Sequence, residues 1–293
     1  MTTPLIVLGS ANRDFTVVVD RHPVPGETVL GGDILSGTGG KGANQAVSAA
    51  RSGVTPVFVS AVGDDSTGHD LLAELTAAGV DVTHVQQRAD APTGVALITV
   101  AADGENTIVV AAGANGRLEA DATSALVSSL VEPGTIVLAQ LEIPLDVVTA
   151  SATAASERGA RIVLNLSPSQ PLPTELLALC DPLVVNESEA AALVGHAVDS
   201  KDAAVDAARE LSAGSRSVVI TLGGDGVVLA DDLGLVHRPA QKVTVVDTTG
   251  AGDAFVGALA AALALGSDLS DAVDAGVAAG ALAVQHLGAQ PPA

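Results

Sequence analysis

The stretch DTTGAGDAFVGA, Asp247 to Ala258, predicts three consecutive elements. Val245 to Asp247 should end a strand, the small residues after it should form a turn, and the apolar run Ala254 to Leu265 should continue as a buried helix. The start of a helix carries unpaired backbone N–H groups and the positive end of the helix dipole. Because glycines flank Ala251, an anion can approach these amides closely, and the turn is a candidate phosphate site.

Asp253 follows this turn and puts a carboxylate beside the candidate anion site. A base next to an anion-binding turn is what transfer of a phosphoryl group to a hydroxyl requires. The alternative is that Asp253 only caps the helix, since aspartate is a preferred N-cap residue. The stretch by itself leaves both interpretations open.

Composition narrows the class of partner. The chain has 13 Lys and Arg against 34 Asp and Glu, a formal charge of −21, and such a surface repels DNA, RNA and anionic membranes. We therefore expect no nucleic-acid partner and no membrane association. The N-terminal sequence has no signal-peptide pattern, and Cys180 is the one cysteine, so a reducing, cytoplasmic location is expected. The histidines show no zinc-binding spacing.

Predicted strands and helices alternate along most of the chain, which indicates a mainly parallel sheet covered on both faces. Strands are expected at 5–8, 56–62, 80–85, 135–139, 161–165 and 183–185, and helices at 43–51, 67–78, 121–130, 145–156, near Glu175 and at 269–285. Two weaker hairpins, within 15–35 and 95–111, leave the main pattern. The fold predicted is one three-layer α/β/α domain over 1–293, with excursions from the main sheet at about 14–37 and 93–112.

Several polar residues fall where predicted strands end, and ligands bind beyond the carboxyl ends of parallel strands. These residues are Asn12, Glu142, Asn165, Asn186, Thr221 and Asp247. In an extended segment Asn12 and Asp14 lie on the same face, an arrangement suited to a polyol, although a solvated polar strand end would look the same.

The glycine-rich segment SGTGGKGANQAV precedes a predicted helix. Gly37, Gly39 and Gly42 fit the spacing of the dinucleotide fingerprint, but they follow a polar hairpin rather than a buried strand. A Walker A loop also fails, because Lys41 precedes glycine rather than Ser or Thr. Lys41 and Asn44 are expected to face whatever the glycines admit.

Two further segments leave a structural and a functional interpretation open. Asn186 either caps the helix that follows it or contacts a nucleotide, and Glu189 either completes a capping box or supports a metal through water. The sequence ITLGGDGV, Ile220 to Val227, is either a plain hairpin or a glycine turn that offers amides to a nucleotide.

The motifs GSANRD, GGKGANQAV, GDDSTG, QLEIP, NESEA, TLGGDG, DTTGAGDAF and LGAQP occur in this order over nearly the whole chain. In this the chain resembles the ribokinase/PfkB family of sugar kinases. The resemblance implies ATP-dependent phosphorylation of D-ribose at the 5-hydroxyl, giving D-ribose 5-phosphate and ADP. The alternatives are the same chemistry on 2-deoxyribose or another small sugar, and a non-catalytic sugar-binding regulator on the same scaffold.

The resemblance also implies roles for residues. Asp253 would be the general base, and the amides of Gly250, Ala251 and Gly252 would stabilise the transferred phosphoryl group. The residues implied at the sugar are Asn12, Asp14, Gly40, Lys41, Gly42, Ala43, Asn44, Glu142 and Asp253. The residues implied at ATP are Asn186, Thr221, Leu222, Gly223, Gly224, Asp225, Gly226, Gly252 and Asp253.

Metal ions and a second subunit are implied as well. Mg²⁺ would bridge the phosphates, with Glu189 supporting it through water. A monovalent-cation site for K⁺ would be formed by Asp247, Thr249, Ala283, His286, Gly288 and Pro292, and here Pro292 stands where a small hydroxyl residue is usual. The two excursions would form a small β-sheet lid that covers the sugar and pairs two chains into a homodimer.

Overall fold

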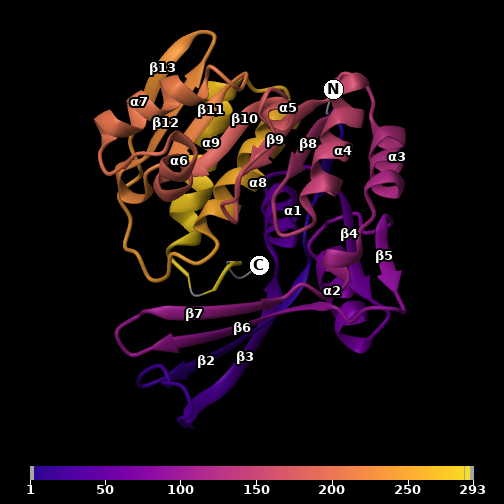
Figure 1. Cartoon of the computed structure of the whole chain (residues 1–293), viewed down its shortest axis with the longest axis vertical. Helices are drawn as coiled ribbons and strands as arrows, with labels where there is room; N and C mark the ends of the chain where they lie inside the picture. The colour runs from indigo at the N-terminus through magenta and orange to yellow at the C-terminus, as the bar shows by residue number, and fades with distance from the viewer. Residues whose placement is uncertain (1–2, 287, 291–293) are drawn as a thin grey trace.

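The computed structural model describes residues 3–286 and 288–290, and a nine-stranded sheet forms its middle layer (Figure 1). The strand order is β13 (Gly234–Arg238), β12 (Val227–Asp231), β11 (Val218–Thr221), β10 (Cys180–Asn186), β9 (Arg161–Asn165), β8 (Ile136–Ala139), β1 (Leu5–Leu8), β4 (Val57–Gly63) and β5 (Val85–Arg88). All neighbours are parallel except β11–β12 and β12–β13, which are antiparallel. The predicted α/β/α class is confirmed.

Helices cover both faces of this sheet, and strand β1 shows why. Its alternate residues enter two separate cores, Leu5 and Val7 on one face and Ile6 and Leu8 on the other. The first face packs against α1 (Lys41–Arg51), α2 (Ser66–Ala77), α8 (Ala251–Ala264) and α9 (Leu269–Ala283). The second packs against α3 (Ala120–Leu130), α4 (Leu145–Glu157), α5 (Thr174–Leu177), α6 (Glu187–Val194) and α7 (Lys201–Leu211).

A second, four-stranded sheet extends away from the main body, as Figure 1 shows in its lower part. Its order is β3 (Gly31–Gly39), β2 (Asn12–Val19), β6 (Gly94–Ala101) and β7 (Asn106–Ala111). The two hairpins predicted as excursions are these four strands. They join through β2 and β6, which pair in parallel from Asn12 and Gly94 onward.

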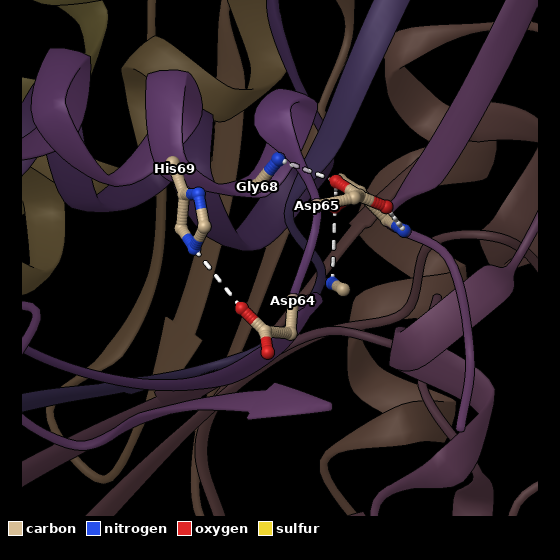
Figure 2. A network of polar contacts seen from close by, with 6 residues as sticks. Asp64, Asp65, Gly68 and His69 are labelled. Atoms are coloured by element: carbon tan, nitrogen blue, oxygen red, sulfur yellow. Dashed lines mark hydrogen bonds and ion pairs between the residues drawn. The ribbon is translucent and has the colours of Figure 1, made fainter. Parts of the chain in front are cut away.

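Asp65 anchors the root of this second sheet (Figure 2). Its carboxylate caps α2 by accepting from the Gly68 N–H at 2.8 Å, and it also accepts from the hydroxyl and the N–H of Thr93 at 2.7 and 2.9 Å. Thr93 directly precedes β6, so one side chain connects the start of α2 to the start of the second hairpin. Beside it, Asp64 contacts His69 at the surface.

Some predicted elements are wrong or incomplete. The strand expected at 80–85 begins only at Val85, because Val80 packs into the core at the end of α2 and Asp81 makes an isolated bridge. The strand expected at 245–247 is absent: Val245 and Val246 are exposed, and the amides of Val246 and Asp247 donate to the carbonyl of Val284 instead. Helix α7 and strand β13 were not predicted.

Cys180 is a buried thiol that donates to the carbonyl of Leu176 at 3.2 Å. Burial raises its pKa to about 12, as is typical of a structural rather than a reactive cysteine. Within the described ranges, every helix is too short or too polar to cross a membrane.

Candidate active site

Helix α8 begins one turn earlier than predicted. Gly250 is its N-cap with a φ of 74°, and a Cβ there would overlap the backbone of Ala289, so glycine is required. Asp253 is the third residue of the helix, and the structure records no side-chain cap at this end. The capping interpretation of Asp253 is therefore wrong. Within the described residues, the amides of Gly252 and Asp253 find no backbone acceptor, as an anion site requires.

Asp253 is buried, with 8% of its surface exposed, and amide side chains of α1 hold its carboxylate. Asn44 Nδ2 donates to Oδ2 at 3.2 Å, and Gln45 Nε2 donates to Oδ1 at 2.9 Å. Burial raises the pKa of Asp253, while the charge of Lys41 and the two amide donors oppose that rise. The group is thus a carboxylate with a raised proton affinity, which suits a general base.

A cleft of about 140 Å³ opens beside Asp253, between the carboxyl ends of strands and the starts of helices. It brings together eight of the residues singled out from the sequence, namely Lys41, Asn165, Asn186, Glu189, Thr221, Gly250, Gly252 and Asp253. Lys41 comes from the start of α1, and Asn186 and Thr221 from the ends of β10 and β11. The cleft thus places a cation, free helix amides and a base side by side, an arrangement that can bind a phosphate chain next to a hydroxyl.

A second group of carboxylates lies at the junction of the two sheets. Glu142 accepts from the Ser10 hydroxyl at 2.6 Å and from the Lys41 N–H at 3.0 Å. Asp14, on β2, has one buried oxygen without a hydrogen-bond partner among the described residues. Burial, and then the charges of Glu142 and Asp253, raise the pKa of Asp14 to about 6. An unpaired buried carboxylate calls for a donor, and a sugar hydroxyl is one.

Other residues that the sequence places at the sugar are held at the same junction. Asn12 is buried and accepts from Asn115 Nδ2 at 2.7 Å, and Asn115 also binds the backbone of Ala11. Gly40 has a φ of 86° and packs so close to the backbone of Ser10 and Asn12 that a side chain would clash. Gly42 and Ala43 lie buried in the first turn of α1.

At α6 the structure is compatible with both interpretations of Asn186 and Glu189, as helix-capping residues and as residues of the site. Asn186 caps the helix in a complete capping box: its side chain accepts from the Glu189 N–H, and Glu189 accepts from the Asn186 N–H at 2.8 Å. Both side chains also border the cleft. Burial raises the pKa of Glu189.

The segment after β11 is a hairpin, because β11 and β12 pair antiparallel across it. Gly223 to Asp225 form a short 3₁₀ turn, with Leu222 before it and Gly224 within it. Gly226 packs against the backbone of Arg238 and Ala240, which explains that glycine structurally. Thr221 borders the cleft; the turn itself does not line it.

The expected cation-site residues come together only in part. Asp247 accepts from the N–H and hydroxyl of Thr249 at 2.9 and 2.6 Å, and from the Gly288 N–H at 2.8 Å. The carbonyl of Ala283 accepts from the His286 N–H at 3.2 Å. Pro292 lies outside the described residues. Among those that are described, no three His, Cys, Asp or Glu side chains form a metal-binding cluster.

Sequence reasoning missed several residues around Asp253. Gln45 contacts its carboxylate, Gln140 contacts Gln45, and Ser10 contacts Glu142. For Gln45 a signal existed, because Lys41, Asn44 and Gln45 share one face of a helix at i, i+3 and i+4. Asn165 was noted as a strand end but given no role, and it accepts from Gln45 at 3.0 Å.

Comparison with known proteins adds a family-level result. A model described as pfkB family carbohydrate kinase matches residues 2–293. A ribokinase of Staphylococcus aureus (strain COL) is 38% identical over 293 residues, covering 99% of this chain and 96% of the relative. A deoxyribokinase of Salmonella typhi is 33% identical over 288 residues, covering 98% of this chain and 94% of the relative.

The fold has a solved counterpart of the same extent. The structure titled as Arabidopsis thaliana ribokinase complexed with ribose and ATP matches with a TM-score of 0.89 and 33% sequence identity. The match covers 99% of this chain and 95% of that one. The similarity in sequence and in fold thus extends over nearly the whole of each chain.

Proposed function

The chain belongs to the pfkB family of carbohydrate kinases, and from that membership we propose that it transfers the γ-phosphate of ATP to the 5-hydroxyl of D-ribose. The products are D-ribose 5-phosphate and ADP. The observation that carries this proposal is the juxtaposition, around one cleft, of Lys41, the Asp253 carboxylate and the amides of Gly252 and Asp253 that have no backbone acceptor among the described residues. It is an enzyme of the phosphotransferase class with an alcohol as acceptor.

The residues support a direct transfer. Asp253 accepts the proton of the ribose 5-hydroxyl as that oxygen bonds to the γ-phosphorus. The bond from the γ-phosphorus to the β,γ-bridging oxygen breaks, and its electron pair leaves with ADP. The amides at the start of α8 donate to the equatorial phosphoryl oxygens, and Lys41 offsets their charge.

ATP would lie along the cleft, with Asn186 and Thr221 at its edge and Leu222 to Gly226 beyond. Mg²⁺, when bound, neutralises phosphate charge. The residues fit such an ion held mainly by phosphates and water, because Glu189 on α6 places a carboxylate at the cleft and no protein cage is present among the described residues.

A K⁺ ion beside the α8 turn would draw on oxygen atoms of Asp247, Thr249, Ala283, His286 and Gly288. The fit rests on Asp247, whose carboxylate accepts hydrogen bonds from Thr249 and Gly288 and so brings these two residues to one place. We expect the rate to fall severalfold when K⁺ is replaced by Li⁺ at constant ionic strength. An unchanged rate would show that these residues hold no activating cation.

D-Ribose would lie between the two sheets, held by Asn12, Asp14, Gly40 to Asn44 and Glu142. The unpaired oxygen of Asp14 supports this placement. The alternative acceptor is 2-deoxyribose, since a deoxyribokinase is among the relatives. The four-stranded sheet would act as a lid that excludes water, a competing acceptor.

We also propose a homodimer formed through this lid. One face of the four-stranded sheet carries a row of paired residues, namely Leu35, Thr16, Ile98 and Ile108. Asp14 lies on the same face, two residues before Thr16 on β2. Leu35 and Ile108 are exposed, as a covering second subunit would explain. A cytoplasmic location fits the use of ATP and remains a prediction.

The test is ADP release with a panel of pentoses and hexoses, followed by NMR of the product. D-Ribose should give the highest kcat/KM, with the phosphate on O5. A higher value for 2-deoxyribose would assign the alternative substrate, and ADP release that is independent of every sugar would overturn the proposal.

A further inference from the structure

A line of buried amide side chains lies behind Asp253. Gln140, which follows β8, donates through Nε2 to Gln45 Oε1 at 2.6 Å. Gln45 Nε2 then donates to Asp253 Oδ1 at 2.9 Å and to Asn165 Oδ1 at 3.0 Å. Gln45 and Gln140 are both 0% exposed, so water does not compete for these contacts.

The partners of Gln45 fix which way its amide points. Its NH₂ group faces two oxygens, the carboxylate of Asp253 and the amide oxygen of Asn165, while its own oxygen faces an NH₂ group. A flipped amide would set its oxygen against both acceptors. Asn165 is itself held by its Nδ2, which donates to the carbonyl of Val184 at 3.3 Å. The donor is therefore locked onto Asp253.

This arrangement is costly for folding. Gln140 Oε1 is buried without a hydrogen-bond partner among the described residues. A Cβ at Gly9 would overlap the same oxygen, so a glycine makes the room that the side chain occupies. An apolar residue at position 140 would avoid the unpaired acceptor. The polar choice makes sense if Gln140 orients Gln45.

We propose that Gln45 is a positioning residue that aims the Asp253 carboxylate at the acceptor hydroxyl and favours its ionised form, with Gln140 and Asn165 holding Gln45 in place. The inference rests on the proposed function, because it assigns Asp253 the role of base. Gln45 acts through Asp253 and needs no contact with either substrate.

The charges around Asp253 set the size of this effect. Lys41 on α1 lowers its pKa, Glu142 raises it, and the carboxylates of Asp14 on β2 and Glu189 on α6 are coupled to it with the same sign as Glu142. One lysine thus faces three carboxylates. When the neutral hydrogen-bond donor Gln45 is removed, the surrounding charges disfavour the ionised form of Asp253.

The first experiment is the pH profile of kcat for Gln45→Met, which keeps the length of the side chain and removes both hydrogen-bonding groups. The acid limb should move up by about one pH unit, so kcat should fall about tenfold on that limb and less at high pH. KM for ATP and for ribose should stay within about twofold of the wild type.

Ser48→Ala is the matched control. Ser48 lies on the same helix and donates to the carbonyl of Ala254 at 2.7 Å, so it also links α1 to α8 but does not touch the carboxylate. It should lower the melting temperature without moving the pH profile. If Gln45→Met lowers kcat equally at every pH, or if Ser48→Ala moves the limb as much, the positioning role is wrong.

A second measurement separates this inference from the proposed function. The ¹³C carboxyl signal of Asp253, assigned by its loss in Asp253→Asn, can be titrated in the protein without substrates. Its pKa should rise in Gln45→Met and rise less in Gln140→Met, which also serves if Gln45→Met does not fold. An unchanged pKa in the folded variants overturns the inference. If the wild type phosphorylates no sugar while the two variants show these pKa shifts, the proposed function is overturned instead.

Discussion

Asp14 and Asp253 are two carboxyl groups in one site whose pKa values are both raised by burial. The negative charge of Glu142 raises both pKa values further, and the charge of Asp253 adds to the rise at Asp14. Such a pair is unfavourable for folding and useful for function, since one group can accept a proton and the other can bind a hydroxyl. At this scale the site is strained electrostatically rather than sterically.

Asp14→Asn should stabilise the protein in a pH-dependent way. The native pKa of about 6 lies above the ordinary aspartate value of 3.8, so the native state binds the proton more tightly and stability falls as pH rises between these values. The full penalty is at most about 3 kcal/mol and is reduced by solvent screening. Urea unfolding should show a gain at pH 8 that exceeds the gain at pH 5 by about 1 kcal/mol.

Equal gains at the two pH values would mean that Asp14 is not protonated more readily in the folded state. The control is Asp33→Asn, an exposed aspartate on β3. It should change stability by less than about 0.5 kcal/mol at either pH.

At the scale of elements, Asp65 is one of the side chains that connect the body to the second sheet, beside Glu74, which binds Arg13 and Thr38. It caps α2 and holds Thr93 through two hydrogen bonds, as Figure 2 places it, while the adjacent Asp64 has only a surface contact with His69. Burial by itself would raise the pKa of Asp65, but the hydrogen bonds from Thr93 and Gly68 lower it below its usual range. One carboxylate thus ties the start of α2 to the start of β6.

Asp65→Ala should cost about 2–4 kcal/mol, since it removes a helix cap and leaves the Thr93 N–H without its acceptor. Asp64→Ala is the matched neighbour: its side chain is 54% exposed, and the loss should stay below about 1 kcal/mol. Urea unfolding of both variants at pH 7 is the measurement. Equal losses would show that Asp65 does not anchor the sheet.

Most elements could be predicted from the sequence because apolar alternation and glycine turns are local signals. The prediction of a strand at 80–85 is wrong because Val80 is buried under a helix end rather than in the sheet. An apolar residue in the sequence does not reveal which of these two surroundings will bury it. Within the site, Asp253 and Lys41 follow from motifs. The contact of Gln45 with Asp253 spans 208 positions and depends on how α1 packs against α8, which no local pattern encodes.

At the scale of the whole molecule, the second sheet is the part that the body does not cover. Strand β7 is exposed throughout, with apolar residues on both of its faces. The face that includes Asp14 is the one we propose for dimer contact, since closing it would complete the sugar site as well as cover apolar surface.

Ile108→Asp should therefore convert a dimer into a monomer, because it puts a charge into that face. Val109→Asp is the control: it is the next residue, equally apolar and 62% exposed against 52% for Ile108, but it points to the opposite face. Sedimentation velocity over a range of concentrations should show dissociation for the first variant only. If both variants or neither dissociate, the proposed face is wrong.

The central claim, that Asp253 is the base of a sugar kinase, is tested most directly by Asp253→Asn. Asp271→Asn is its control, since Asp271 is likewise the third residue of its helix, α9, where its N–H donates to the capping side chain of Asp268 at 2.8 Å. Turnover with ATP and D-ribose should fall at least about 10²-fold in Asp253→Asn, while calorimetry still detects binding of both substrates, and Asp271→Asn should be unaffected. Unchanged turnover in Asp253→Asn would contradict the account.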